Sequence, residues 1–582
     1  ASRYERGARQ QEMLRCNMAS GGARGLSSFE LPDDVPERTM ARMRSSFVLF
    51  LPGLMAALAA CGDDEADPAG GGGTSGGTTA STGGQGGAGG EVTPAGEIAS
   101  VSAPTRTQVQ IEVTGSMATS PVDAAAYQIT SEHGPLVVTA VSVDGQRIVL
   151  ETEKQKLGVT YELVVAAPGS DLDLEGDSFL AADTATFWTS DFGNNFQSVE
   201  KTARRVGVGE HVVLYATDDV SPNDVAETIQ VFDETVFPTE TQLLHAAPDR
   251  DDNGRIVLLG LDGDGYYGGY FNPLDSLPAE MVEPWGYKSN EMEMLYISIP
   301  DTQGKFDPWG VTPHELSHLL YNEEHDVFSE DWSWHNEGLA ECAVKAVHGS
   351  NDTATYWFLN APDLATGKSL VQWEYANYAQ YVQAFVFWTY VAGRLGGVAG
   401  YGQLFDQTGD PTAIDAFFQA ELGQSFAEVQ LDLMTAAWVE APTGPHGFNG
   451  MLTLGADPQS SSIDSMPALS PFEAVFLTGA SGAITPAGQG PDVRIRGVDA
   501  SGAITDAAPF NADGGVMIVL NALQDPDEMA TQPGGTFPAA LPVQPASRRP
   551  ANVSRDPAWR HPPPVKPANK RLLERWLART RR

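Results

Sequence analysis

Hydrophobic and polar positions along the chain fall into stretches of different periodicity. Between residues 91 and 190, short runs alternate apolar and polar side chains and are separated by turn residues. Alternation with a period of two indicates strands with one buried face. Asp144 and Gly145 separate two of these runs and predict a hairpin turn. About seven strands are expected in this stretch, which favours a β-sandwich. The clearest runs are 109–113, 136–141, 148–150 and 161–165.

The stretch from 191 to 455 changes character halfway along. Strand-like apolar runs come first, and helical periodicity follows them, predicting helices near 311–322, 335–348 and 378–395. Strands followed by helices are typical of an α+β domain. The early runs are 211–215, 256–259 and 295–299.

Short strand-like runs return near the end of the chain and predict a small β-domain over 456–525. They are 451–454, 474–477, 493–496 and 517–520. Beyond them, residues 526–582 are rich in Pro and Arg. We interpret this tail as disordered, or as translation that ran out of frame.

The beginning of the chain has the composition of targeting and linker segments. Residues 40–61 hold two arginines, an apolar run and the ending Leu-Ala-Ala-Cys at Cys61, which indicates an export signal. Residues 62–90 are mostly small and polar and predict a flexible linker. Residues 1–39 precede the signal and are interpreted as a mis-predicted leader.

Composition limits the partners and the compartment. The net charge of −41 argues against nucleic acid and anionic membrane surfaces as partners and fits an exported acidic protein. The three cysteines are Cys16, Cys61 and Cys342, and only Cys342 lies in a predicted folded domain. No disulfide framework is therefore expected, and the protein is predicted to be monomeric.

The pattern His-Glu-x-x-His at residues 314–318 carries the strongest chemical signal. On a helix, His314 and His318 point to the same side and can hold one zinc ion, with Glu315 beside the attacking water as general base. Glu337, nineteen residues after His318, supplies a third ligand. Catalytic zinc sites use three protein ligands and leave one position for water. The pattern therefore predicts a catalytic zinc centre.

Two further features extend this hypothesis. Glu341 follows Glu337 by one helical turn and is either an acceptor for the free ring nitrogen of His314 or a plain surface acid. The alternating oxygen ligands Asp249, Asp251 and Asn253, with Gly254 at the sixth position, fit a calcium loop. Position twelve of that loop is Gly260, so it is not an EF-hand, and a solvated turn explains it equally well.

The zinc motif with the block Asn-Glu-Gly-Leu-Ala-Glu at 336–341 resembles the gluzincin clan of peptidases, which includes thermolysin and aminopeptidase N. The sequence before the motif is similar to that of hyicolysin-type neutral metallopeptidases. The similar stretches are Gly-Gly-Tyr-Phe at 268–271 and Asn-Glu-Met-Glu-Met-Leu-Tyr at 290–296. The likeness covers about residues 200 to 400. It implies a zincin catalytic domain.

The same resemblance implies two substrate-handling elements. A tyrosine from a later helix would stabilise the oxyanion, which points to Tyr381, with Tyr375 and Tyr378 as competitors. The strand near 296–299 would pair with an extended substrate. The Gly-x-Met-Glu-Asn sequence of the aminopeptidases is absent, which favours an endopeptidase.

Two other resemblances concern the first part of the chain. Leu-Ala-Ala-Cys resembles a bacterial lipobox, which implies a lipid anchor at Cys61 and a location in the periplasm or on the cell surface; an ordinary cleaved signal is the alternative. Residues 126–129 and 157–161 resemble bacterial immunoglobulin-like modules. The expected fold is therefore multidomain: an immunoglobulin-like β-sandwich over 91–190, an α+β zincin domain with a mainly helical second half, and a small C-terminal β-domain.

The leading functional hypothesis is a zinc-dependent endopeptidase acting on proteins or peptides. The alternative from another class is a surface adhesion lipoprotein with a structural or degenerate zinc site. A structural site has no need of Glu315, which favours the enzyme. A zinc hydrolase acting on a non-peptide bond shares the same core and remains a third hypothesis.

Overall fold

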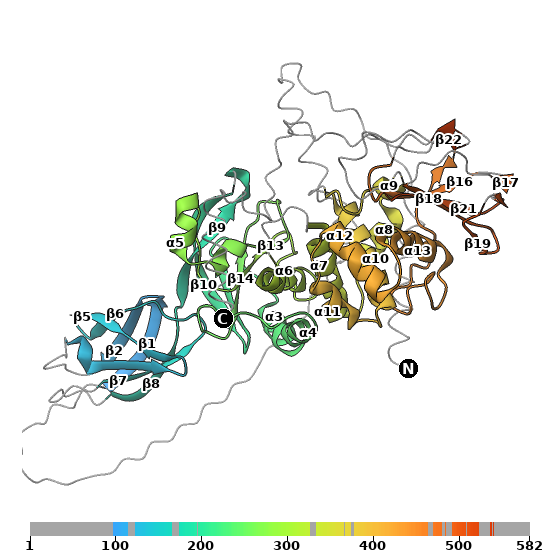
Figure 1. Cartoon of the computed structure of the whole chain (residues 1–582). Helices are drawn as coiled ribbons and strands as arrows, with labels where there is room; N and C mark the ends of the chain where they lie inside the picture. The colour runs from blue at the N-terminus through green and yellow to red at the C-terminus, as the bar shows by residue number, and fades with distance from the viewer. Residues whose placement is uncertain are drawn as a thin grey trace, which may run out of the picture. The chain divides into compact units, whose positions relative to one another are not determined.

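The computed structural model describes most of the chain between residues 97 and 522. The described ranges are 97–114, 123–165, 174–194, 196–325, 333–365, 367–373, 377–463, 469–479, 483–484, 492–507, 509–511, 513–522, 536–537 and 539–540. The predicted leader, the export signal with Cys61 and the linker lie outside these residues, as does nearly all of the predicted tail. Figure 1 shows the order of the described parts: strands first, then a mainly helical region, then a small last sheet.

The first part consists of two four-stranded antiparallel sheets, ordered β1-β2-β6-β5 and β4-β3-β7-β8. Side chains from both sheets, among them Ile111, Leu150, Ile129 and Leu163, join one buried cluster. Alternate positions of each strand supply it, as the period of two predicts. The strands are β1 (Glu97–Thr105), β2 (Gln108–Thr114), β3 (Tyr127–Ser131), β4 (Gly134–Leu136), β5 (Val138–Asp144), β6 (Arg147–Thr152), β7 (Thr160–Val165) and β8 (Leu174–Leu180).

The predicted hairpin is present between β5 and β6. Asp144 pairs with Arg147 at its end, and Gly145 has φ of +64°, a conformation that glycine adopts without strain. The predicted run 136–141 is not one strand. It divides at Val137, so that Leu136 ends β4 in one sheet while β5 begins in the other.

The second part is built on a six-stranded mixed sheet ordered β13-β14-β12-β11-β10-β9. Strand β9, which spans the predicted boundary at residue 190, pairs with β10 and so belongs to this sheet. Strands β11, β12 and β14 are parallel. The strands are β9 (Thr184–Asp191), β10 (Gln197–Val208), β11 (Val212–Thr217), β12 (Ile256–Leu261), β13 (Gly269–Phe271) and β14 (Met294–Ser298).

Both faces of this sheet are covered. Val212 and Leu214 of β11 join a cluster with the helices, while Val213 and Tyr215 join a second cluster that includes Tyr296. Burial on both faces explains why these strands read as continuous apolar runs.

The predicted helices at 311–322, 335–348 and 378–395 are confirmed as α6 (Val311–Glu324), α7 (Ser333–His348) and α10 (Tyr378–Arg394). The other helical elements of the described residues are α3 (Val225–Val231), the π-helix η3 (Phe232–Val236), α4 (Phe237–Leu243), α5 (Ala279–Val282), α8 (Asp352–Asn360), α9 (Pro362–Ala365), α11 (Gly400–Phe405), α12 (Pro411–Glu421), α13 (Phe426–Val439) and the 3-10 turns η1 (Ala124–Ala126), η2 (Phe192–Asn194), η4 (Pro273–Ser276) and η5 (Glu283–Trp285). None of the described helices is both long and apolar enough to span a membrane.

The last sheet has the order β15-β16-β21-β18-β19 and packs against α13. The predicted strand at 451–454 is absent, because these residues follow α13 without regular structure. Four described residues of the predicted tail form a short strand pair, β22 with β23. The strands are β15 (Ser461–Ser462), β16 (Ala474–Thr478), β17 (Ala483–Ile484), β18 (Val493–Val498), β19 (Ile504–Thr505), β20 (Phe510–Asn511), β21 (Val516–Asn521), β22 (Thr536–Phe537) and β23 (Ala539–Ala540).

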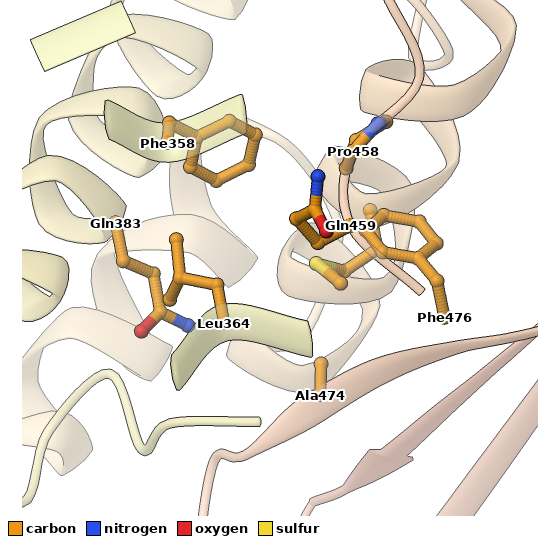
Figure 2. A pocket seen from close by; sticks show the side chains of 8 residues that line it. Phe358, Leu364, Gln383, Pro458, Gln459, Ala474 and Phe476 are labelled. Atoms are coloured by element: carbon orange, nitrogen blue, oxygen red, sulfur yellow. The ribbon is translucent and has the colours of Figure 1, made fainter. Parts of the chain in front are cut away.

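A small cavity lies where the helices meet this last sheet. Figure 2 shows Phe358 and Gln383 on one side and Phe476 on the other. Its volume of about 20 Å³ leaves room for roughly one water molecule. None of the predicted metal ligands lines this cavity.

Candidate metal centre

Two buried helices carry the predicted metal ligands. His314 and His318 lie on α6, and Glu337 lies near the start of α7. The first turn of α6 is held by the carboxylate of Asp307, which accepts a hydrogen bond from the backbone N–H of Val311 at 2.9 Å. Most of α6 is buried on all sides, so tertiary packing rather than an amphipathic face fixes its position.

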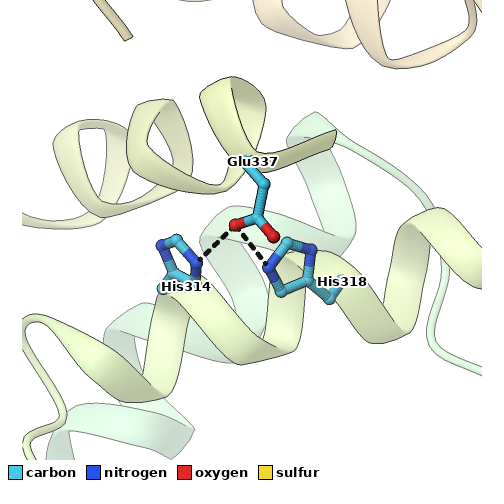
Figure 3. A group of neighbouring side chains, drawn as sticks. All are labelled: His314, His318 and Glu337. Atoms are coloured by element: carbon cyan, nitrogen blue, oxygen red, sulfur yellow. Dashed lines mark ion pairs between the residues drawn. The ribbon is translucent and has the colours of Figure 1, made fainter. Parts of the chain in front are cut away.

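The three predicted ligands converge on one point. Oε2 of Glu337 lies 3.4 Å from Nε2 of His314 and 3.4 Å from Nε2 of His318, as Figure 3 shows. Ligand atoms of a tetrahedral zinc ion, with bonds of about 2.0–2.1 Å, lie about 3.3 Å apart. The observed spacings therefore fit a metal ion at the centre of these three atoms.

Neighbouring polar groups orient the two imidazole rings. Nδ1 of His318 lies 2.9 Å from Oδ1 of Asn336. A proton on Nδ1 is donated to this oxygen, which leaves the lone pair of Nε2 facing the metal position. Nδ1 of His314 faces Oε1 of Glu341 at 3.7 Å, an ion-pair distance longer than a hydrogen bond. Glu341 is itself held by Asn351, whose Nδ2 donates to Oε2 at 2.7 Å.

The charges at this position favour a cation. Burial lowers the pKa of His314, but the hydrogen bond that its ring donates to Glu337 and the charges of Glu315, Glu341 and Glu337 outweigh it, and the pKa is raised overall. Each of these carboxylates is less than a tenth exposed, so solvent screens them weakly. A positive charge placed among the histidines is therefore stabilised.

Glu315 lies beside the edge strand of the six-stranded sheet. A methyl group at Gly269 of β13 would come within 3.0 Å of Cγ of Glu315 and 2.4 Å of the Val311 side chain. Gly269 thus permits α6 to approach β13 closely, which places the predicted general base next to the sheet edge.

Close packing also fixes the helix that carries Glu337. A methyl group at Gly338 would meet Cδ1 of Trp388 at 2.6 Å and Cβ of Ala384 at 2.7 Å. Helix α10 therefore touches the backbone of α7 directly beside the third ligand. A 3.0 Å contact between Tyr321 Oη and His335 Nδ1 joins α7 to α6.

The predicted oxyanion donor is less well defined. Tyr381 is buried on α10 and packs against Trp373 and Tyr378. Tyr378, one turn earlier, has an electrostatic link to the centre: burial and then the charge of Glu341 raise the pKa of its hydroxyl, although 39% of the residue is exposed. Tyr375 lies outside the described residues.

The strand predicted to pair with substrate is not available for pairing. Strand β14, which contains Tyr296, is flanked by β12 on one side and β13 on the other. The edge is β13, which no periodicity marked because it has only three residues. Both sides of the predicted pairing strand are therefore occupied by other strands, so this prediction is wrong, and the neighbouring edge strand is β13.

The predicted calcium loop holds a different set of side chains from the one expected. Asp249 and Asp251 lie together, and the third carboxylate beside them is Glu293. Asn253 is turned into the loop: its Oδ1 accepts from the N–H of Arg255 at 2.6 Å, and its Nδ2 donates to Asp251 at 3.2 Å. Asn253 therefore shapes the loop and contacts the cluster through Asp251.

The sequence did not predict three residues that take part in these clusters. Asn336 contacts His318, Asn351 holds Glu341, and Glu293 joins Asp249 and Asp251. Adjacent helical residues do not share a face, so nothing in the spacing links Asn336 to His318. Glu293 is separated from Asp251 by more than forty residues, and only the pairing of β12 with β14 brings them together.

Comparisons with known proteins do not identify a family. No family model matches the chain, and no curated protein matches it. Solved structures of the bacterial S-layer protein SbsC match fragments only. One has a TM-score of 0.14 and 14% identity over 19% of this chain and 18% of the other. A second, its N-terminal part, has a TM-score of 0.15 and 16% identity over 23% and 29%. The chain thus spans less than a third of these proteins, and the likeness carries no argument.

Proposed function

We propose that the chain is a zinc endopeptidase with His314, His318 and Glu337 as metal ligands and Glu315 as general base. The observation that carries the proposal is the convergence of Nε2 of His314 and Nε2 of His318 on Oε2 of Glu337, each at 3.4 Å. Glu315, which is buried, lies on the same helix as the two histidines. Two neutral nitrogens and one carboxylate are a donor set typical of hydrolytic zinc.

Zinc bound here would supply Lewis acidity and a water molecule acidic enough to be deprotonated near neutral pH. Glu315 would then act as the general base that accepts the proton of the attacking water. It then delivers the proton to the amine nitrogen when the carbon–nitrogen bond breaks. Asn336 keeps His318 in one tautomer through its 2.9 Å contact.

An extended peptide fits the edge of the sheet. Strand β13 pairs with β14 on one side and with no other described strand on its outer side. Its Gly269 lies against Glu315. A substrate that adds to this edge by backbone hydrogen bonds would carry its peptide bonds past the general base. This supports an endopeptidase, which must take a chain running on both sides of the cleaved bond.

The resemblance to gluzincins, and within them to hyicolysin-type peptidases, belongs to the same proposal. A few strands before the zinc helix and a mainly helical second half support it. For the first part we propose an immunoglobulin-like module, supported by the strand orders β1-β2-β6-β5 and β4-β3-β7-β8, which match the two sheets of that fold with one added edge strand. Export and a lipid anchor at Cys61 remain part of the proposal on sequence grounds alone.

The test compares two matched substitutions on helix α6. Glu315→Gln should keep one zinc ion per chain and the native melting temperature, and should lower casein hydrolysis by at least about 100-fold. Glu324→Gln removes the same charge from the end of the same helix and should leave hydrolysis unchanged. Casein hydrolysis by Glu315→Gln at the wild-type rate would refute the mechanism.

Substrate profiling separates the remaining alternatives. A library of internally quenched peptides should be cut at internal bonds. Stoichiometric zinc with no hydrolysis of any peptide would favour the adhesion protein, and hydrolysis of ester or amide probes alone would favour a non-peptide bond as the target.

A further inference from the structure

A second cluster of acidic side chains lies apart from the zinc ligands. Asp249 and Asp251 belong to the loop before β12, and Glu293 immediately precedes β14. One ligand oxygen from each lies within 4.8 Å of the other two. The loop is built to hold them: Oδ1 of Asp249 accepts from the N–H groups of Asn253 and Gly254 at 2.9 and 3.1 Å.

Two oxygens of the cluster are buried without a partner. Glu293 is 1% exposed, and its Oε2 makes no hydrogen bond within the described part of the chain. The side chain of Asp251 is 9% exposed, and its Oδ1 likewise makes none. A buried carboxylate oxygen without a partner is costly, so each of these atoms calls for a proton or a cation.

The geometry argues against a proton shared by the two acids. A proton shared by Asp251 and Glu293 would draw Oδ1 and Oε2 into a hydrogen bond, and neither atom makes one. It would also leave no role for Asp249. A calcium ion binds oxygens at about 2.3–2.6 Å, so atoms on opposite sides of it lie about 5 Å apart. One oxygen from each of the three acids lies within 4.8 Å of the other two, which is close enough for all three to reach one ion.

We propose that Asp249, Asp251 and Glu293 form a calcium site. The three carboxylates supply three to six of the oxygens that calcium takes, and water completes the shell from the exposed side at Asp249. The proposal is independent of the function proposed above, because no zinc ligand takes part in it.

Nearby cations do not replace the proposed ion. Arg106 approaches Oδ2 of Asp251 only to 3.8 Å. Arg250 reaches Glu293 with Nε at 3.9 Å, while its guanidinium is held by Glu323 through two contacts of 2.7 Å. Lys156 pairs with Asp252, whose carboxylate is outside the cluster. None of these cations contacts Oδ1 of Asp251 or Oε2 of Glu293 by a hydrogen bond.

The loop of the acidic cluster is connected to the helix that carries His314 and His318. The cluster joins the loop before β12 to the start of β14, and Val257 N–H donates to the backbone oxygen of Glu293 at 2.9 Å. Arg250 in the same loop donates hydrogen bonds to the carboxylate of Glu323 near the end of α6. The loop that holds the proposed ion is therefore joined to the end of α6, beyond His318.

The experiment is a calcium titration of the full chain, first stripped with chelator and reloaded with one equivalent of zinc. Calorimetry with calcium chloride should give one bound ion per chain, and saturating calcium should raise Tm by at least about 3 °C. Glu293→Gln and Asp251→Asn should each weaken binding by at least about tenfold.

Asp252→Asn is the matched control, because it removes the same charge from the same loop outside the cluster, and it should bind calcium as the wild type does. Asp249 is the exposed member of the cluster, so Asp249→Asn is the second variant if a substitution at a buried position fails to fold. This variant should also weaken calcium binding. Absence of calcium binding at millimolar concentration, or equal binding by wild type, Glu293→Gln and Asp249→Asn, would overturn the proposal.

Discussion

The proposed zinc cluster of His314, His318 and Glu337 and the proposed calcium cluster of acids are both groups of three side chains, but they are assembled differently. His314 and His318 stand one turn apart on a single helix, so local geometry aligns two of the three ligands. In the acidic cluster, Asp251 comes from the loop before β12 and Glu293 from the residue just before β14. One cluster is fixed mainly by helical periodicity, and the other by the register of β12 with β14.

This difference has a chemical counterpart. The zinc cluster offers two nitrogens and one carboxylate with oriented rings, which suits a metal that keeps an open position. The acidic cluster offers only oxygens, which suits a hard cation with a filled shell. We therefore expect the first to act in chemistry and the second in stability, and the two to respond to substitution independently.

Glu337→Ala should have the largest effect. Removal of the anionic ligand is expected to weaken zinc binding by well over about 100-fold and to abolish hydrolysis. This is a larger loss than the one expected when a residue that only hydrogen-bonds to a ligand is removed. Calcium binding should be unchanged. Zinc content by mass spectrometry and calcium calorimetry on the same preparation measure both. Simultaneous loss of both metals in a folded variant would show that the clusters are not independent.

Asn336→Ala removes the group that orients His318 without removing a ligand. We expect a loss of about 10–100-fold in zinc affinity, because the ring is free to rotate and its tautomer is no longer fixed. Competition against a chelating dye gives the affinity. Asn336→Asp, which keeps the acceptor oxygen, should restore most of it; equal losses in both variants would argue that Asn336 does not orient the ring.

Gly338→Ala tests whether packing on α10 holds Glu337 in place. In an open helical position this change stabilises by about 1 kcal/mol, but here the new methyl group meets Trp388 and Ala384 at 2.6 and 2.7 Å. We expect destabilisation by about 1–3 kcal/mol and weaker zinc binding. Urea unfolding of the zinc-loaded protein gives the sign, and a stabilised variant would contradict the close approach of the helices.

Asp275 is a buried acid that needs no cation, and so it sharpens the contrast with Glu293. Its carboxylate accepts from Asn290 and Tyr296, yet burial raises its pKa to about 7 against these hydrogen bonds. Because the pKa of Asp275 is higher in the folded protein than in the unfolded chain, its protonated form stabilises the folded state. This stabilisation is fully present below about pH 4 and is lost as the pH rises through about 7.

Asp275→Asn should therefore reduce the loss of stability between pH 5 and pH 8 by at least about 1 kcal/mol, and calcium should not change this difference. Denaturant unfolding at both pH values, with and without calcium, measures it. An identical pH dependence in variant and wild type would mean that Asp275 does not titrate in this range.

The sequence predicted elements whose signal is local. The three long helices of the second part and the hairpin at Asp144 and Gly145 are confirmed, because periodicity and turn residues act over a few positions. The prediction of a strand at 451–454 was wrong, since an apolar run forms a strand only where a neighbouring strand pairs with it. The pairing of β9 with β10 could not be predicted, because alternation along one strand does not determine which sheet that strand joins.

The candidate sites show the same division. The spacing of His314 and His318 was sufficient to predict their common side, and Glu337 joined them because α7 packs on α6. Asn336 and Glu293 could not be predicted, because their roles depend on how one element docks on another. The edge position of β13 depends on strand order, which its three residues do not encode.

The most direct test of the central claim is a zinc titration of the chelated chain while casein hydrolysis is followed. The account predicts no hydrolysis without metal and a linear rise to a plateau at one zinc per chain, with no rise for Glu315→Gln at the same zinc content. Full hydrolysis by the metal-free chain, or a zinc-saturated wild type that cleaves no peptide, would contradict it.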